Sequence, residues 1–243
     1  MMRTANPALN ANVFTAVPYA ETRMTINGTV NKAGVLLILA VAGAGWTWHL
    51  FSVSAKFAPW MIGGVLGGLI MALVTIFKKE LAAITAPIYA LLEGLFLGGI
   101  SAIFESRYPG IVVQAVGLTF GIFACLLLAY RSGLIKPTEN FKLGVVAATG
   151  GIALVYIVSF IMGFFNTQVP FIHSNGIIGI GFSLFVVVIA ALNLVLDFDF
   201  IESGAEMGAP KYMEWYAAFG LMVTLVWLYI EILRLLAKLS SRR

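Results

Sequence analysis

The chain has 243 residues, of which 60% are hydrophobic and only 11% are charged, and its mean hydropathy is +0.97. A soluble domain carries about 25% charged residues, so this chain has too few to cover a water-facing surface. The formal net charge of +4 does not indicate nucleic-acid binding, because the basic residues lie in short loops and at the tail, where membrane topology explains them. The single cysteine, Cys125, cannot form an intrachain disulfide. The composition predicts one integral membrane domain.

Segment 1–32 is polar and lacks the apolar centre of a signal peptide. We expect it to lie in the cytoplasm, with the first span acting as an uncleaved insertion signal. The predicted organisation is this polar segment, a transmembrane domain over residues 33–237, and a short basic tail over residues 238–243.

Seven apolar segments are long enough to cross the hydrocarbon core of a bilayer, which needs roughly 20 helical residues. They lie at residues 33–54, 59–77, 86–104, 111–130, 143–165, 177–196 and 215–236. The runs are continuous and lack the alternation with period 2 that is typical of an outer-membrane barrel. The predicted fold class is therefore an all-α integral membrane protein, a seven-transmembrane-helix bundle. Because the connectors are too short to fold alone, the function must lie in the bundle.

Lysine and arginine predict the orientation, because cytoplasmic loops carry an excess of both. With the N-terminus inside, the inner side receives Arg3, Arg23, Lys32, Lys78, Lys79, Arg131, Lys136, Lys142 and Lys211. The outer side then receives Lys56, Arg107, Arg234, Lys238, Arg242 and Arg243. The loops favour a cytoplasmic N-terminus. The basic tail does not fit this orientation, because it would then lie outside, where few basic residues are expected. Either the rule fails at the last span, or the last segment re-enters and both termini are cytoplasmic. We favour seven full spans.

Small residues four apart lie on one helix face and allow two helices to approach closely. The second and third predicted spans contain such pairs: Gly63–Gly67, Gly64–Gly68 and Gly94–Gly98. This pattern is common in membrane bundles, so we interpret these glycines as packing positions.

Glu93 is a carboxylate inside the third predicted span, within YALLEGLFLGGIS. A charged group at the centre of a membrane helix costs about 2.5–3.5 kcal/mol on insertion scales, which makes it a functional candidate. No basic residue lies within one helical turn of Glu93, so a partner comes from another helix or the carboxyl group stays protonated. We interpret Glu93 as a candidate proton sensor. The alternative is a structural acid that is hydrogen-bonded to the backbone.

A second polar cluster, NLVLDFDFIESG, lies at the end of the sixth predicted span. Asn193 and Asp197 are four residues apart and share a helix face, whereas Asp199 points elsewhere if the helix continues. Asp197 would lie at a pore mouth, where carboxylates concentrate cations. We therefore take Asp197 as a gating candidate and Asn193 and Asp199 as ion-pathway candidates. Asp197 and Asp199 are also candidate ligands for weak, transient calcium binding. The alternative is a polar helix end with ordinary loop acids.

Glu231 lies near the end of the last predicted span, and Arg234 follows three residues later on the same helix. This spacing allows a local ion pair. Glu231 is therefore a third gating candidate, with a purely interfacial ion pair as the alternative.

Enzyme motifs are missing from the sequence, which has no P-loop, HExxH, GxSxG or Rossmann fingerprint. The histidines are isolated and form no pattern of metal ligands. We expect no enzymatic activity and no cofactor, apart from a calcium ion bound in passing. The expected partners are the lipid bilayer, cations and another membrane protein, but not nucleic acid.

Five segments, in their order and spacing, resemble the Bax inhibitor family, also called the transmembrane Bax-inhibitor-motif proteins, and its bacterial YccA-like branch. They are NPALN (6–10), MTINGTVNKAG (24–34), PIYALLEGLFLGGIS (87–101), ALNLVLDFDFIESG (191–204) and EWYAAFGLMVTLVWLYIEILRLL (214–236). The resemblance covers nearly the whole chain. It implies a seven-helix fold in the cell membrane, the inner membrane for a bacterial protein, with the last helix surrounded by the other six.

The resemblance also implies a pH-sensitive calcium leak. In the relatives, an aspartate on the sixth span and one on the seventh share a proton and gate the leak, because two close carboxylates do not both ionise easily. Asp197 matches the first aspartate. Counting back from the pair Leu233 and Arg234, the second position falls at Thr224, which is not an acid. Thr224 therefore joins the ion-pathway candidates, and the only acid in that span, Glu231, lies about two turns later.

Two functional hypotheses follow. The first is a passive cation channel or leak, with calcium favoured, that is gated by protonation of Glu93 or Asp197. The second is a non-transporting membrane regulator that binds another membrane protein, such as a protease or a stress factor.

Overall fold

A computed structural model of the chain describes residues 23–53, 56–165 and 176–241. Its long helices are α1 (Ile26–Ser52), α2 (Ala58–Phe77), α3 (Ala82–Arg107), α4 (Ile111–Arg131), α5 (Glu139–Phe164), α6 (Ile177–Glu206) and α7 (Met213–Ser240). A short 3-10 turn, η2 (Lys79–Leu81), joins α2 to α3. All seven long helices in the described residues have the length and the apolar composition to cross a membrane. The predicted all-α bundle of seven spans is therefore confirmed.

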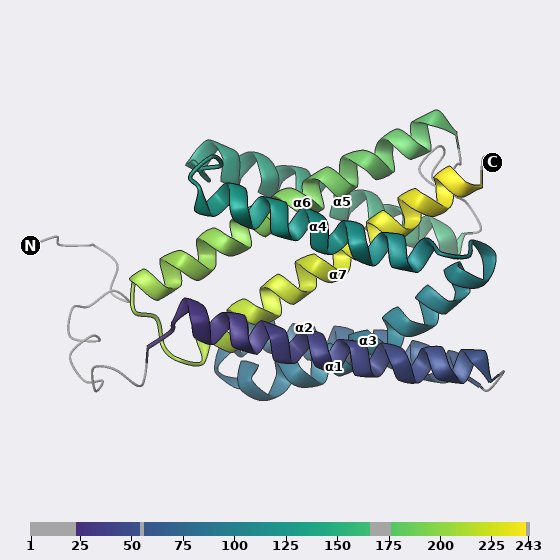
Figure 1. Ribbon diagram of the computed structural model, residues 1–243, viewed down its shortest axis with the longest axis horizontal. Helices are drawn as coiled ribbons and strands as arrows, with labels where there is room; N and C mark the ends of the chain where they lie inside the picture. Colours follow the sequence, from purple (N-terminus) through teal and green to yellow (C-terminus); the bar gives the residue numbers. More distant parts are fainter. Residues whose placement is uncertain (1–22, 54–55, 166–175, 242–243) are drawn as a thin grey trace, which may run out of the picture.

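Helix α7 lies at the centre of the bundle (Figure 1), between a layer formed by α1, α2 and α3 and a layer formed by α4, α5 and α6. It packs against α1, α3, α4 and α6, and it is the most buried of the seven spans. Helices α2 and α5 lie at the periphery, where α2 packs on α3 and α5 packs on α6. The prediction of a central last helix is confirmed, and α7 is continuous over its 28 residues.

The helices extend beyond the predicted spans. Helix α1 begins at Ile26 rather than near residue 33, because the hydroxyl of Thr25 caps it by accepting a hydrogen bond from Gly28 N at 3.0 Å. Helix α6 continues past residue 196 to Glu206. Residues 1–22 and 242–243, which belong to the predicted N-terminal segment and basic tail, lie outside the described residues.

Glycines on α1, α2 and α3 allow backbone-to-backbone contact. A Cβ atom on Gly94 would lie 2.2 Å from the carbonyl oxygen of Ala40, and one on Gly98 would lie 2.1 Å from that of Ala44. On α2, a Cβ atom on Gly64 would lie 2.5 Å from the carbonyl oxygen of Leu92. A Cβ atom on the neighbouring Gly63 would meet nothing within 4 Å. The interpretation as packing positions therefore holds for Gly64, Gly94 and Gly98 but not for Gly63.

We predict that Gly94→Ala lowers the stability of the protein, because the added methyl group collides with backbone that has no room to move. Overpacking of this kind costs about 1–3 kcal/mol. The matched control is Gly63→Ala, where the space is open and alanine's better helix propensity favours the variant by up to about 1 kcal/mol. Thermal unfolding of both variants in detergent measures the difference. Equal midpoints would show that the α1–α3 contact is looser than described.

Candidate functional site

Asp197 lies on α6 and faces α7 inside the bundle. Its Oδ2 atom is buried and has no hydrogen-bond partner among the described residues. The side chain of Thr224, on α7, lies beside the same carboxyl group. Hydrocarbon provides no water to replace a missing partner. Among the described residues, this Oδ2 atom is the one buried side-chain nitrogen or oxygen atom without a hydrogen-bond partner.

Thr224 lies on α7 at about the place where the resemblance led us to expect a second acid. It is buried, and its hydroxyl donates to the carbonyl oxygen of Gly220 at 3.3 Å. The structure therefore brings together Asp197 and Thr224, two of the predicted site residues. The pair at the α6–α7 interface is a carboxyl group and a hydroxyl group rather than two carboxyl groups.

Asn193 and Asp199 connect α6 to α5. The Nδ2 atom of Asn193 donates to Thr149 Oγ1 at 2.8 Å and to the carbonyl oxygen of Ile189 at 2.9 Å. Asp199 forms an ion pair with Lys142 at 2.8 Å. Asp199 thus points away from the α6–α7 interface, and the two aspartates of the DFD sequence face different helices.

Glu93 lies in a different interface, between α3 and α2. A Cβ atom on Gly68 would lie 3.1 Å from Glu93 Oε2, which places the carboxyl group against α2. Within the part of the chain that the structure describes, no hydrogen bond or ion pair reaches Glu93, and its electrostatic neighbour is Tyr89, one turn earlier on α3. The structure does not bring Glu93 and Asp197 together.

Glu231 is buried with an exposed fraction of 2%, and its Oε1 atom has two partners. Tyr156 donates its hydroxyl to it at 2.9 Å, and Arg234 pairs with it at 3.0 Å. The guanidinium group of Arg234 also lies over the ring of Tyr156. The predicted local pair of Glu231 and Arg234 is present, and it ties α7 to α5.

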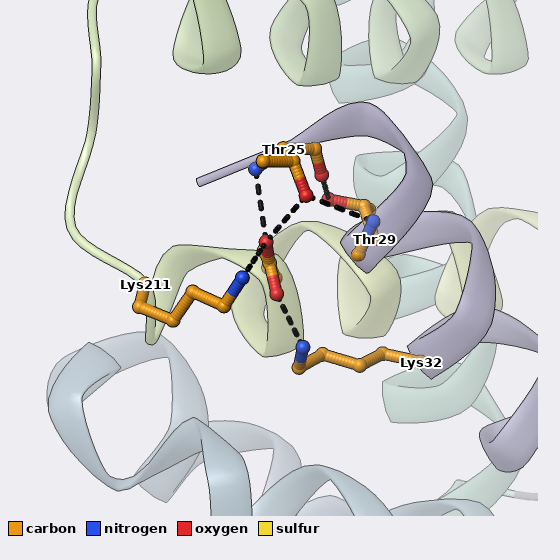
Figure 2. Close-up of polar contacts among 6 residues, drawn as sticks. Thr25, Thr29, Lys32 and Lys211 are labelled. Atoms are coloured by element: carbon orange, nitrogen blue, oxygen red, sulfur yellow. Dashed lines mark hydrogen bonds and ion pairs between the residues drawn. The ribbon is translucent and has the colours of Figure 1, made fainter. Parts of the chain in front are cut away.

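Sequence reasoning missed Glu214, the first acid of α7, whose side chain is fully buried. Figure 2 shows Thr25, Lys32 and Lys211 converging on one point, which is the Glu214 carboxylate. Its Oε1 atom accepts from the Thr25 amide and hydroxyl, both at 2.9 Å, and pairs with Lys211 at 3.0 Å. Lys32 pairs with its Oε2 atom. We call these four residues the Glu214 cluster.

The Glu214 cluster fixes the start of α1 against the start of α7. The residues that precede Thr25 add backbone contacts with the loop before α7. The Met24 amide donates to the carbonyl oxygen of Ala209 at 2.7 Å, and Arg23 and Pro210 form an isolated antiparallel β-bridge. The only signal in the sequence was Lys211, three residues before Glu214. That spacing allows an ion pair but does not reveal that the first helix covers the acid.

The carboxylates are spread among several interfaces. In residues 23–53, 56–165 and 176–241, no three His, Cys, Asp or Glu side chains gather into a group that could hold a metal ion. At Asp197, a cation would meet one carboxyl group and neighbouring hydroxyl and carbonyl oxygens. Such a donor set is small for calcium, which takes six to eight oxygens.

Seven helices in the described residues are long and apolar enough to cross a membrane, and they define the class, a multi-pass helical membrane protein. The sequence profile of the family described as "Bax inhibitor 1 like" matches residues 6–241, and the chain belongs to this family. None of the curated proteins compared with the chain matches it.

We predict that Lys32→Met lowers the free energy of unfolding by about 1–3 kcal/mol, because it removes a charged partner from a fully buried carboxylate. Lys211→Met is the matched control, since the Lys211 side chain is 49% exposed, against 19% for Lys32. Its loss should cost less than about 1 kcal/mol. Unfolding of the two variants in detergent gives both values. Indistinguishable stabilities would mean that the two lysines contribute equally.

Proposed function

We propose that this protein is a pH-sensitive cation leak, with calcium as the favoured ion, and that the Asp197 carboxyl group is its proton-responsive element. The observation that carries the proposal is the buried Oδ2 atom without a partner. Membership of the Bax inhibitor 1-like family supports the same function.

The physical basis is the cost of an uncompensated charge in hydrocarbon. Ionised Asp197 has the Thr224 hydroxyl beside it but no described cation. Its charge is therefore compensated either by a proton or by a cation that passes along the α6–α7 interface. Protons and cations then compete for one carboxyl group, which makes the passage of ions depend on pH.

The end of α6 supplies a second feature that supports the proposal. Asp199, Glu202 and Glu206 all act electrostatically on Tyr130, so they lie near one another at this end of the bundle. Glu202 and Glu206 are exposed, and Tyr130 donates its hydroxyl to Glu202. A group of acids beside a pathway raises the local concentration of cations.

The excess of basic residues in the loops at the α1 start supports a cytoplasmic N-terminus. These loops carry Lys78 and Lys79 after α2, and Arg131 and Lys136 between α4 and α5. In this orientation the acidic end of α6 faces the cytoplasm. For a bacterial protein the membrane would be the inner membrane.

We predict that calcium flux into liposomes holding the purified protein changes between pH 6 and pH 8. Asp197→Asn should abolish this pH dependence and give, at every pH, the flux of the wild-type protein at acidic pH, because asparagine resembles the protonated carboxyl group in charge. Asp199→Asn is the matched control, with the same chemical change two residues away. Asp199 is already paired with Lys142, so its variant should keep the pH dependence.

Glu93→Gln tests the second carboxyl group in the same assay. Because Glu93 lies at the α2–α3 interface, we expect its variant to keep the pH dependence that Asp197→Asn loses. If Glu93→Gln lost the pH dependence and Asp197→Asn kept it, Glu93 would be the proton-responsive group. Absence of flux above that of empty liposomes at every pH would contradict the leak.

A non-transporting regulator that binds another membrane protein is the second candidate function, and one observation favours it. Helix α5 is the least buried of the seven spans. It exposes Gly144, Ala147 and Gly151 on one face, and Cβ atoms on these two glycines would meet nothing within 4 Å. Small residues on one face permit close contact with a helix of another protein. Absence of flux in the liposome assay would favour this function.

A further inference from the structure

An apolar pocket of about 310 Å³ lies between α1 and α4, with α3 and α7 behind it. Its outer rim includes Val41 and Trp48 on α1 and Val116 and Phe120 on α4, which are exposed on the surface of the bundle. Because α1 and α4 are membrane spans, this rim faces bilayer hydrocarbon. The pocket is distinct from the Asp197 interface, because neither Asp197 nor Thr224 lines it.

The chemistry of the wall selects an apolar occupant. The polar side chains that line the pocket are Ser101, Thr119 and Tyr229. The hydroxyls of Ser101 and Tyr229 are bonded to each other at 2.6 Å, and Thr119 donates to the carbonyl oxygen of Ala115 at 2.8 Å. These hydroxyls are engaged within the protein, and the rest of the wall consists of apolar side chains and glycine. A polar ligand would lose its hydrogen bonds to water here and would form few new hydrogen bonds with the wall.

The pocket is elongated along α1. On α1 the wall runs from Leu37 to Trp48, which is about 16 Å along the helix axis at about 1.5 Å per residue. A groove of this length along a membrane helix matches the extended shape of a lipid acyl chain. A helix of a second copy of this chain, or of another protein, would instead leave the pocket without lipid adducts in the test below.

The direction of the pocket also fits a lipid. Trp48 lies one turn before the end of α1 at Ser52, at the depth where tryptophan marks the membrane interface. From there the wall continues inward to Leu37 on α1 and Phe120 on α4, near the middle of each helix. The pocket therefore runs along the membrane normal from one interface toward the bilayer centre.

We propose that this pocket binds one acyl chain of a membrane phospholipid. The lipid belongs to the leaflet on the side where α1 ends and α4 begins, with its headgroup at the level of Trp48 and its chain end near Phe120. The bound chain fills the space between α1 and α4 and so joins the two layers of the bundle.

The test is photolabelling of the purified full-length protein in nanodiscs that contain a phospholipid with a diazirine in the middle of one acyl chain. Adducts should concentrate on pocket residues of α1 and α4, and the excess over other positions should decrease when unlabelled lipid competes. Gly45→Leu should remove these adducts. Gly45 lines the pocket, and a Cβ atom there meets nothing within 4 Å, so leucine fills the pocket without a backbone collision.

Gly34→Leu is the matched control. Gly34 lies on the same helix and is equally open at its Cβ, but it is not part of the pocket wall. This variant should keep the adducts. Val116→Phe narrows the pocket from α4 and should also remove them, which keeps the test decisive if Gly45→Leu does not fold. Adducts spread evenly over the exposed faces of α2 and α5, unchanged in Gly45→Leu, would show ordinary surrounding lipid and overturn the proposal.

Discussion

The absence of water in the bilayer core is the constraint on which the structure depends. Each polar side chain within a span must find its partner in the protein. Threonines and serines donate to the carbonyl oxygen four residues earlier, as Thr47 and Ser159 do. Glu231 is satisfied by Tyr156 and Arg234. Two carboxyl groups in the described residues depart from this rule: Glu93, which is half-buried and is reached by no hydrogen bond or ion pair, and Asp197, whose Oδ2 atom is fully buried. The buried atom of Asp197 is the more costly of the two to leave without a partner.

The fold was predictable because long apolar runs carry their own signal. A run of about 20 apolar residues has few alternatives to a membrane helix, so seven spans could be placed from hydropathy. The pair of Glu231 and Arg234 was also predictable, since both residues belong to one helix and their contact depends on spacing alone. Thr224 became an ion-pathway candidate through the resemblance to the family, and the structure places its side chain beside Asp197.

Contacts between distant segments were not predictable. Hydropathy cannot show that Gly64 faces a backbone while Gly63 faces open space, since this depends on the rotation of α2 about its axis. Glu214 appeared to belong to a polar connector, yet it is fully buried because the start of α1 lies over it. Likewise, helix periodicity places Asp197 and Asp199 on different faces of one helix, but it does not show which of them has a charged partner. Only the structure shows that Lys142 on α5 pairs with Asp199, whereas the Oδ2 atom of Asp197 has no partner among the described residues.

The Glu214 cluster has a consequence for the order in which the protein is assembled. Thr25 and Lys32 belong to the first helix, and their shared acceptor belongs to the last. During synthesis the first span is made long before Glu214. Until then, Lys32 and the capping residue Thr25 can form hydrogen bonds only with water or with other groups. These contacts of Lys32 and Thr25 with Glu214 therefore form only after α7 has been made. A chain that stops before α7 would lack both its central helix and Glu214, the residue that binds the start of the first helix.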